Sequence, residues 1–289
     1  MNRTKAFYMP HAMAWPHVHV IDREALSDAD AELLMKKCPP GSIDLDMTEE
    51  TFTVEASAIV VATGWRPYDA TKLTNLSFGE HPNILTNVMM ERLAARDGPT
   101  EGEIVRPSDG AKAMNVAFVQ CAGSRDENHL PYCSAVCCMG TLKQIRYLRE
   151  KNPEAKATVF YIDIRTIGRQ EKFYFDLLED EHVTFTKGKV AKIAGDEGSG
   201  NLTLDVEDTI GGQNLHEEFD LVVLATGIVP NGGVPLDLPL DAYGFVDSAE
   251  GMEGVFAVGC ARRPSDVSRS TKEATAAALK AIQCTSGEG

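Results

Sequence analysis

Two stretches of the chain share a pattern that constrains its fold, ASAIVVATGWRP at residues 56–67 and FDLVVLATGIVPN at 219–231. Each is a continuous apolar run rich in β-branched residues, and each ends in Ala-Thr-Gly with a proline close behind. Apolar runs of this length are typical of strands that are buried on both faces, as in parallel sheets. The glycine lets the backbone turn tightly and pass close to another group. The pattern therefore predicts an α/β protein with parallel strands.

The rest of the chain continues this pattern. A third apolar run, GVFAVGCARRP at 254–264, is followed by SDVSRSTKEATAAALKAI, whose capping residues and alanine-rich repeat predict a helix. Between the two Ala-Thr-Gly runs, strand and helix patterns alternate as in a Rossmann-like domain. We expect strands at 114–121, 156–164 and 182–193, helices at about 133–151 and 171–181, and then a small antiparallel meander.

The charge and hydropathy of the chain exclude several classes of partner. With 28 basic and 43 acidic residues, the net charge is −15, which repels nucleic acid and anionic lipid head groups. No apolar stretch reaches eighteen residues, and the segment MNRTKAFYMPHAMAWPHVHV lacks the apolar centre of a signal peptide. We therefore predict a cytoplasmic protein with reduced thiols, no nucleic-acid partner and no direct membrane insertion. Any contact with the inner membrane face would go through a partner protein.

Four of the seven cysteines lie close together, in CAGSRDENHLPYCSAVCC at 121–138. Cys121 ends a predicted strand, and Cys133 and Cys137 are four residues apart, so one face of the predicted helix would carry both. Four thiolates suit a [4Fe-4S] cluster, with one ligand per iron, and they also suit zinc. A pair of redox disulfides and a set of inert buried thiols are the other interpretations.

These motifs resemble a known family. The paired Ala-Thr-Gly strands and the GVFAVG strand that feeds a helix are similar to those of thioredoxin-reductase-type flavoproteins, which have two dinucleotide-binding domains. The stretch CAGSRDENHLPYCSAVCCMGTLKQ, followed by YIDIRT, resembles the family of heterodisulfide reductase A subunits. KAFYMPHAMAWP and CPPGSIDLDM are similar to one branch of that family, the A subunits of the quinone-interacting membrane-bound oxidoreductase of sulfate reducers.

The resemblance implies two cofactors and their ligands. A [4Fe-4S] cluster would be held by Cys121, Cys133, Cys137 and Cys138. The N-terminus of the helix after Asp266 would face FAD, where its partial positive charge stabilises an anionic reduced flavin. The FAD contacts carried over from the family are Thr63, Gly64, Gly259, Cys260, Pro264, Asp266, Val267 and Ser268.

The resemblance also implies a function, an electron-transfer flavoprotein subunit that passes electrons between FAD and the cluster. It would link the quinone pool to a cytoplasmic reductase of sulfate respiration. Its partners would be a B-type flavin and iron–sulfur subunit, together with a membrane subunit that reacts with quinone. The alternatives are a stand-alone FAD-dependent NAD(P)H disulfide reductase and a non-catalytic assembly subunit that holds zinc or no metal.

A division of the chain follows from these assignments. We expect a vestigial ferredoxin-like insert and linker at 1–50 and a tail at 285–289. Residues 51–110 and 219–284 would form the remaining half of an FAD-binding domain. Residues 111–218 would form a degenerate nicotinamide-type domain that carries the cysteines.

Three features depart from the family's pattern. No N-terminal strand leads into the G-x-G-x-x-G turn that holds the FAD pyrophosphate, and the similar string GDEGSG at 195–200 is expected to be a hairpin turn. Either the chain is a truncated piece of the family or the ADP half of the flavin site lies elsewhere. If the chain stands alone, we expect FAD to bind weakly or not at all. Cys260 replaces an Asp that many relatives carry. Cys38 fits only the last position of a ferredoxin cluster run, so we expect it to be structural.

The turn after the strand at 114–121 departs from a nicotinamide site. Such a turn is glycine-rich, whereas here Gly123 is the one glycine left and charged residues crowd the rest. We expect the turn to exclude NADH and NADPH, so that electrons enter or leave through the cluster. The candidate contacts for an anion or a partner protein are Arg125, Arg165 and Arg169.

Overall fold

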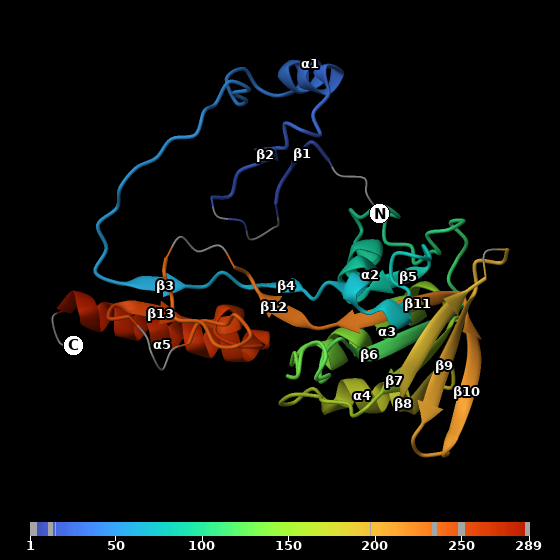
Figure 1. Ribbon diagram of the computed structural model, residues 1–289. Helices are drawn as coiled ribbons and strands as arrows, with labels where there is room; N and C mark the ends of the chain where they lie inside the picture. The colour runs from blue at the N-terminus through green and yellow to red at the C-terminus, as the bar shows by residue number, and fades with distance from the viewer. Residues whose placement is uncertain are drawn as a thin grey trace. The chain divides into compact units, whose positions relative to one another are not determined.

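The computed structural model describes residues 5–10, 14, 16–196, 198–232, 236–247 and 252–286 (Figure 1). The chain divides into two compact units, Met1–Glu55 and Ala56–Gly289. In the first unit, β1 (Phe7–Tyr8) pairs with β2 (Val20–Ile21), and one helix, α1, spans Asp28–Lys37.

Helix α1 has defined ends. Ser27 caps it by accepting a hydrogen bond from the backbone N–H of Asp30. The backbone N–H of Cys38 donates to the Leu34 carbonyl oxygen, so Cys38 lies at the C-terminal end of the helix.

A seven-stranded sheet forms the core of the second unit, in the order β10-β9-β8-β7-β6-β11-β5. The strands from β8 to β5 run parallel, and β8, β9 and β10 form an antiparallel meander. The predicted α/β fold with parallel strands and a meander is thus confirmed. The strands are β5 (Ile84–Thr86), β6 (Asn115–Ala122), β7 (Lys156–Tyr161), β8 (Val183–Gly195), β9 (Leu202–Asp208), β10 (Gln213–Phe219) and β11 (Leu221–Thr226).

The string GDEGSG connects two antiparallel strands, as expected. Gly195 at the end of β8 pairs with Leu202 at the start of β9, and the Gly200 backbone N–H donates to the Asp196 carbonyl oxygen. Glu197 lies outside the described residues. The string is a hairpin turn, so it does not supply a phosphate-binding turn that opens a helix.

The central strands are buried on both faces. Helices α2 (Asn87–Ala94) and α3 (Cys137–Lys151) pack against β11, and α4 (Glu171–Leu178) packs against β8. Alternate residues of β6, Ala117 and Val119, join a core cluster with the short turns η1 (Ala70–Lys72) and η2 (Thr74–Leu76). Successive strand residues point to opposite faces, so the fully buried Val116 and Phe118 fill the other side.

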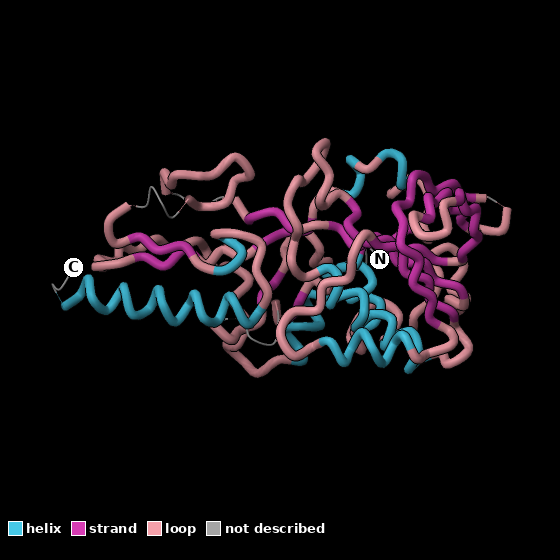
Figure 2. Tube along the Cα trace, turned by 90° about the horizontal axis from the view of Figure 1, so that it is seen from below, coloured by secondary structure: helices cyan, strands magenta, loops and turns pink. Residues whose placement is uncertain are grey.

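A smaller sheet carries the first and third apolar runs. β3 (Ile59–Val61) pairs in parallel with β13 (Val255–Ala257), and the long helix α5 (Val267–Ser286) packs against both (Figure 2). β4 (Trp65–Pro67) and β12 (Ile228–Pro230) form an antiparallel pair. No helix among the described residues is both long and apolar enough to cross a bilayer.

Burial on both faces was the wrong expectation for the first apolar run. Ile59 is 41% exposed and Val60 is 43% exposed. The reason is that β3 has one partner strand, β13, whereas β11 lies between β6 and β5 and against α2 and α3.

The domain boundaries also need correction. β5 and β11 belong to segments that we assigned to the FAD-binding half, yet both pair within the sheet that contains β6. The second Ala-Thr-Gly run is therefore a central strand of the cysteine-bearing domain. The predicted tail begins too early, because α5 continues through Thr285 and Ser286; residues 287–289 lie outside the described residues.

Candidate functional site

The four clustered cysteines come from a strand, a loop and a helix. Cys121 is the last but one residue of β6, Cys133 lies in the loop that follows, and Cys137 and Cys138 open α3. The predicted helix start at 133 is wrong. Ala135 has a φ of +64°, which a right-handed helix cannot contain, so Cys133 shares no helical face with Cys137.

The loop between β6 and α3 concentrates backbone strain. Of the five non-glycine residues with positive φ in the described part of the chain, Arg125 at +55° and Ala135 lie in this loop, and Cys121 at +55° lies at the end of the strand before it. Such conformations persist only where the surroundings enforce them, and they cluster at functional sites.

Hydrogen bonds enforce this loop conformation. Ser124 Oγ lies 2.8 Å from Ser134 Oγ in a buried contact. Ser134 Oγ also accepts a hydrogen bond from the backbone N–H of Ile228 at 3.0 Å, and Tyr132 Oη donates to the Ile228 carbonyl oxygen at 3.0 Å. A Cβ at the neighbouring Gly227 would lie 2.3 Å from Ser124 Oγ, so that position requires glycine. The loop is thus attached to the residues that follow the second Ala-Thr-Gly run.

The four thiols form one electrostatic group. Burial raises the pKa of the Cys121 thiol to about 11; the thiols of Cys138 and Cys133 add to this shift, and Arg125 opposes it. Burial also raises the pKa of Cys137 well above its ordinary value, with further contributions from the other three thiols. The pKa of Cys138 is raised by burial and by Cys133, against a hydrogen bond from the Arg165 backbone. Each thiol therefore interacts with the other three.

The donor chemistry fits a cluster of metal ions. All seven cysteines are free of disulfides, and the four thiols would lose their protons on binding a metal. The buried side-chain amide of Gln120, next to Cys121, has no hydrogen-bond partner among the described residues. Helix α3 has no side-chain cap at its N-terminus, and Cys137 and Cys138 are its first two residues. Within the described part of the chain, however, no three His, Cys, Asp or Glu residues are arranged to hold a single metal ion.

The predicted flavin contacts meet at the ends of β3 and β13. The backbone N–H of Val258 donates to the Val61 carbonyl oxygen at 3.0 Å, so Thr63 and Gly64 follow one strand while Gly259 follows its neighbour. Ligands of open α/β sheets bind at the carboxyl ends of parallel strands. The structure thus brings the two groups of predicted residues to one such edge.

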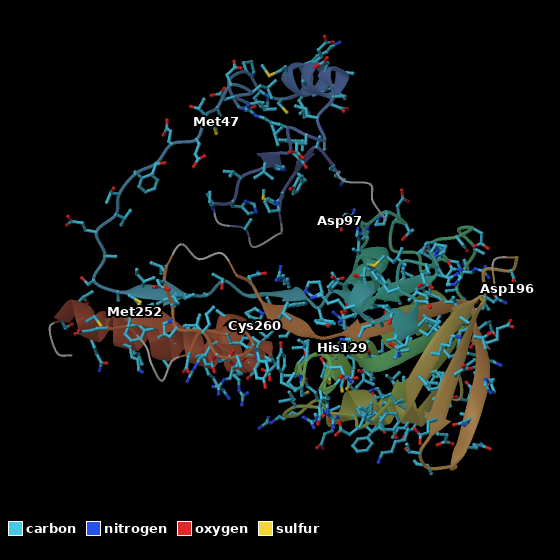
Figure 3. The ribbon with its side chains drawn as sticks, in the orientation of Figure 1. Met47, Asp97, His129, Asp196, Met252 and Cys260 are labelled. Atoms are coloured by element: carbon cyan, nitrogen blue, oxygen red, sulfur yellow. The ribbon has the colours of Figure 1, made fainter. Side chains whose placement is uncertain are left out.

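Gly259 is required by the geometry of this joint. Its φ is +57°, and a Cβ would lie 3.2 Å from Ser270 Oγ. Its backbone N–H donates to Glu273 Oε2 at 2.9 Å. Cys260 begins the turn to α5, and its Sγ donates to the Ser265 carbonyl oxygen at 3.3 Å (Figure 3).

The N-terminus of α5 completes the joint. Asp266 Oδ1 caps the helix by accepting a hydrogen bond from the Arg269 backbone N–H at 2.8 Å. Val267 is 83% exposed. Pro264 precedes the cap, and Ser268 lies in the first turn of the helix.

Three residues near these groups escaped the sequence analysis. Tyr68, after β4, contacts the cysteine loop at His129, which Figure 3 labels. Asn231 Nδ2 donates to the Thr63 carbonyl oxygen at 2.9 Å and so ties together the ends of the two Ala-Thr-Gly runs. Asp163 binds two of the candidate arginines. The position of Asn231 just after the second Ala-Thr-Gly run could have indicated it from the sequence. Nothing in the sequence indicated the partners of Tyr68 and Asp163.

Comparison with known proteins identifies relatives of the whole chain. No known protein-family model matches. Over 97% of its length, the chain is 35% identical to the A subunit of the H(2):CoB-CoM heterodisulfide,ferredoxin reductase of Methanothermobacter thermautotrophicus. The chain is a homologue of heterodisulfide reductase A subunits. Over 98% of its length it is 34% identical to the A subunit of the Ferredoxin/F(420)H(2)-dependent CoB-CoM heterodisulfide reductase of Methanosarcina acetivorans. The chain spans 44% and 37% of these two relatives, which is less than half of their length.

The fold of this heterodisulfide reductase homologue is similar to that of a solved structure. Thioredoxin reductase from Lactococcus lactis matches with a TM-score of 0.50 at 15% identity, over 78% of this chain and 65% of that chain. The predicted resemblance to heterodisulfide reductase A subunits and the predicted thioredoxin-reductase-type fold are both confirmed.

Proposed function

We propose that this chain is an electron-transfer flavoprotein segment of a heterodisulfide-reductase-like oxidoreductase. Cys121, Cys133, Cys137 and Cys138 hold a [4Fe-4S] cluster, and the joint formed by the ends of β3 and β13 holds FAD. The observation that carries the proposal is the group of four free cysteines at the end of β6, in the loop that follows it and at the start of α3. The relatives named as heterodisulfide reductases support a redox role.

The protein's own groups prepare the site for negative charge. When bound, the cluster supplies one-electron transfer and FAD supplies two-electron chemistry. Before metal binding, the Cys137 thiol donates to the Thr226 carbonyl oxygen at 3.6 Å and the Cys138 thiol to the Asp163 carbonyl oxygen at 3.8 Å. These bonds orient two of the thiols, and the N-terminal N–H groups of α3 stabilise the thiolates once the protons leave.

The proposed FAD contacts are the eight residues at the joint. Thr63 and Gly64 approach from the first Ala-Thr-Gly run; the others are Gly259, Cys260, Pro264, Asp266, Val267 and Ser268. Their position at the carboxyl ends of two parallel strands, beside a helix N-terminus, supports this assignment.

The physiological role that we propose follows the branch of the family with the most similar motifs. The chain would act between the quinone pool and a cytoplasmic reductase of sulfate respiration, at the inner membrane face. Its partners would be a B-type flavin and iron–sulfur subunit, together with a membrane subunit that reacts with quinone. The net charge of −15 supports contact with the membrane through such a partner.

The test of the proposed function is anaerobic preparation of the chain with iron and sulfide. The expected result is about four iron and about four sulfide per chain, as a cube requires. A preparation that takes up stoichiometric zinc and no sulfide would overturn the cluster assignment and favour a non-catalytic assembly role.

A further inference from the structure

Two arginines and one aspartate lie beside the cysteine group. Arg125 Nη1 is 2.6 Å from Asp163 Oδ1, and Arg165 Nε is 3.3 Å from the same oxygen. Arg165 Nη2 is 3.4 Å from Asp163 Oδ2. Arg125 belongs to the cysteine loop, whereas Asp163 and Arg165 follow β7, so the carboxylate joins guanidinium groups from two different segments.

The same three residues lie beside the cysteine group. Arg125 is part of the cysteine loop, four residues beyond Cys121. The Asp163 carbonyl oxygen accepts the bond from Cys138 Sγ. The side chain of Arg125 is 25% exposed, so water screens its charge less than that of a surface arginine.

We infer that Arg125 and Arg165 set the reduction potential of the cluster, through the positive charge that they and Asp163 hold beside the cysteine group. This inference rests on the proposed function, because it requires the cluster. Two guanidinium groups and one carboxylate leave a net charge of +1 beside the thiolates. Since reduction adds one electron, breaks no bond and needs no proton, this charge favours the reduced form and raises the midpoint potential.

The expected size follows from Coulomb's law. A unit charge about 4 Å from the site changes an equilibrium constant about fivefold in bulk water, and more near a protein surface. Because the arginines are partly exposed, we expect an effect near the lower limit. Removing one guanidinium should lower the equilibrium constant for one-electron reduction about fivefold to tenfold, and tenfold is about 59 mV.

The experiment is an anaerobic potentiometric titration of the full 289-residue chain, followed by electron paramagnetic resonance. The variants are Arg125→Gln, Arg165→Gln and the double variant. Arg125→Lys keeps the positive charge and removes the planar guanidinium group. The matched control is Arg169→Gln, since Arg169 is an exposed arginine of the same region, four residues beyond Arg165. Iron and sulfide are measured in every sample.

The inference expects a lower midpoint potential in each Gln variant, a larger shift in the double variant, and little change in Arg125→Lys and Arg169→Gln. Equal midpoint potentials in the wild type and the double variant, with full iron content in both, would overturn the inference and leave the proposed function standing. A shift in Arg169→Gln as large as in the other variants would also overturn it, because long-range charge would then suffice. No cluster in the wild type would overturn the proposed function, and the inference with it.

Discussion

Tyr68 Oη lies 2.9 Å from His129 Nδ1, so the residue after β4 is bonded to the loop that carries the cysteines. The Tyr68 ring also packs over Gly123 in the same loop: a Cβ on Gly123 would lie 2.8 Å from ring carbon Cδ1. With a φ of +82°, Gly123 is required both for its backbone conformation and for this close approach.

Gly123→Ala is therefore expected to destabilise the protein. Backbone strain and the displaced Tyr68 ring should together lower the free energy of unfolding by about 1–3 kcal/mol. Denaturant unfolding of the apoprotein measures this. The matched control is Gly140→Ala in α3, where a Cβ meets nothing within 4 Å and helix propensity should give a gain of up to about 1 kcal/mol. Equal effects of the two substitutions would contradict the role assigned to the Tyr68 contact.

Loss of a single helix-start cysteine should abolish the cluster. Cys137→Ala or Cys138→Ala removes one of the four proposed iron ligands, and the iron–sulfur absorbance and bound sulfide of the anaerobic preparation are expected to disappear. Cys284→Ala, in the last turns of α5, is the control and should keep both. Retention of a full cluster in Cys137→Ala would show that this thiol is not a ligand.

FAD is expected to bind the chain weakly. The joint of β3, β13 and α5 offers contacts, but the 289 residues contain no G-x-G-x-x-G turn that opens a helix to hold the pyrophosphate. Flavin fluorescence titration should give a dissociation constant above about 1 μM. Fusion of a dinucleotide-binding half to the N-terminus should tighten it. A dissociation constant below about 1 μM for the unfused chain would mean that another loop holds the pyrophosphate.

NADH and NADPH should not reduce the flavin-loaded protein. The loop after β6 is closed by its own hydrogen bonds, and Asp126, held by Lys189 at 2.9 Å, places negative charge where a pyrophosphate would lie. Anaerobic stopped-flow mixing measures the bleaching of the flavin. Rates of about 1 s⁻¹ or faster, typical of turnover, would revive the NAD(P)H disulfide reductase alternative.

The sequence predicted the parts of the fold that depend on local pattern. The unbroken apolar run of β11 marked a strand buried on both faces, because such burial requires a run of this kind. The start of α3 was missed because Ala135 takes its left-handed conformation next to Ser134, which bonds to Ile228, a residue 94 positions away. No local signal encodes that contact. The exposure of β3 was missed for a similar reason, since its pattern equals that of β11 and only the number of neighbouring strands differs.

The cysteine spacing identified the thiol group but not its charged surroundings. Asp163 lies 38 residues beyond Arg125 in the chain, and pairing between an arginine and an aspartate at that distance follows from the adjacency of β6 and β7.

Asp180→Asn should lower the free energy of unfolding more at neutral pH than at acid pH. Burial opposes ionisation of Asp180, but hydrogen bonds from the Arg149 guanidinium and the His182 backbone N–H outweigh it and lower the pKa of the carboxyl. The pair is bidentate, with Nε to Oδ2 at 2.8 Å and Nη2 to Oδ1 at 3.1 Å. A carboxyl with a lowered folded-state pKa stabilises the protein above its unfolded pKa of about 3.9, and this stabilisation is lost as the pH falls through the folded value.

At pH 7 the Asp180→Asn variant is expected to lose about 1–3 kcal/mol, and the difference from wild type should shrink below about pH 4. Urea unfolding at several pH values measures both. Lys172→Ala breaks a pair with Asp176 in which the lysine side chain is 83% exposed, and it should cost under about 1 kcal/mol. A difference that stays constant down to about pH 3 would show that the carboxylate charge is not the cause.

The bonds from Tyr132 and Ser134 to Ile228 also fix an order of events during synthesis on the ribosome. The cysteine loop emerges first, yet the residue that fastens it follows 96 positions after Tyr132. At translation rates of about 5–20 residues per second, the four thiols wait roughly 5–20 s before their loop can close. In this interval the nascent chain presents four reduced thiols to oxidants. The loop that carries them can reach its final conformation only after Ile228 has been made.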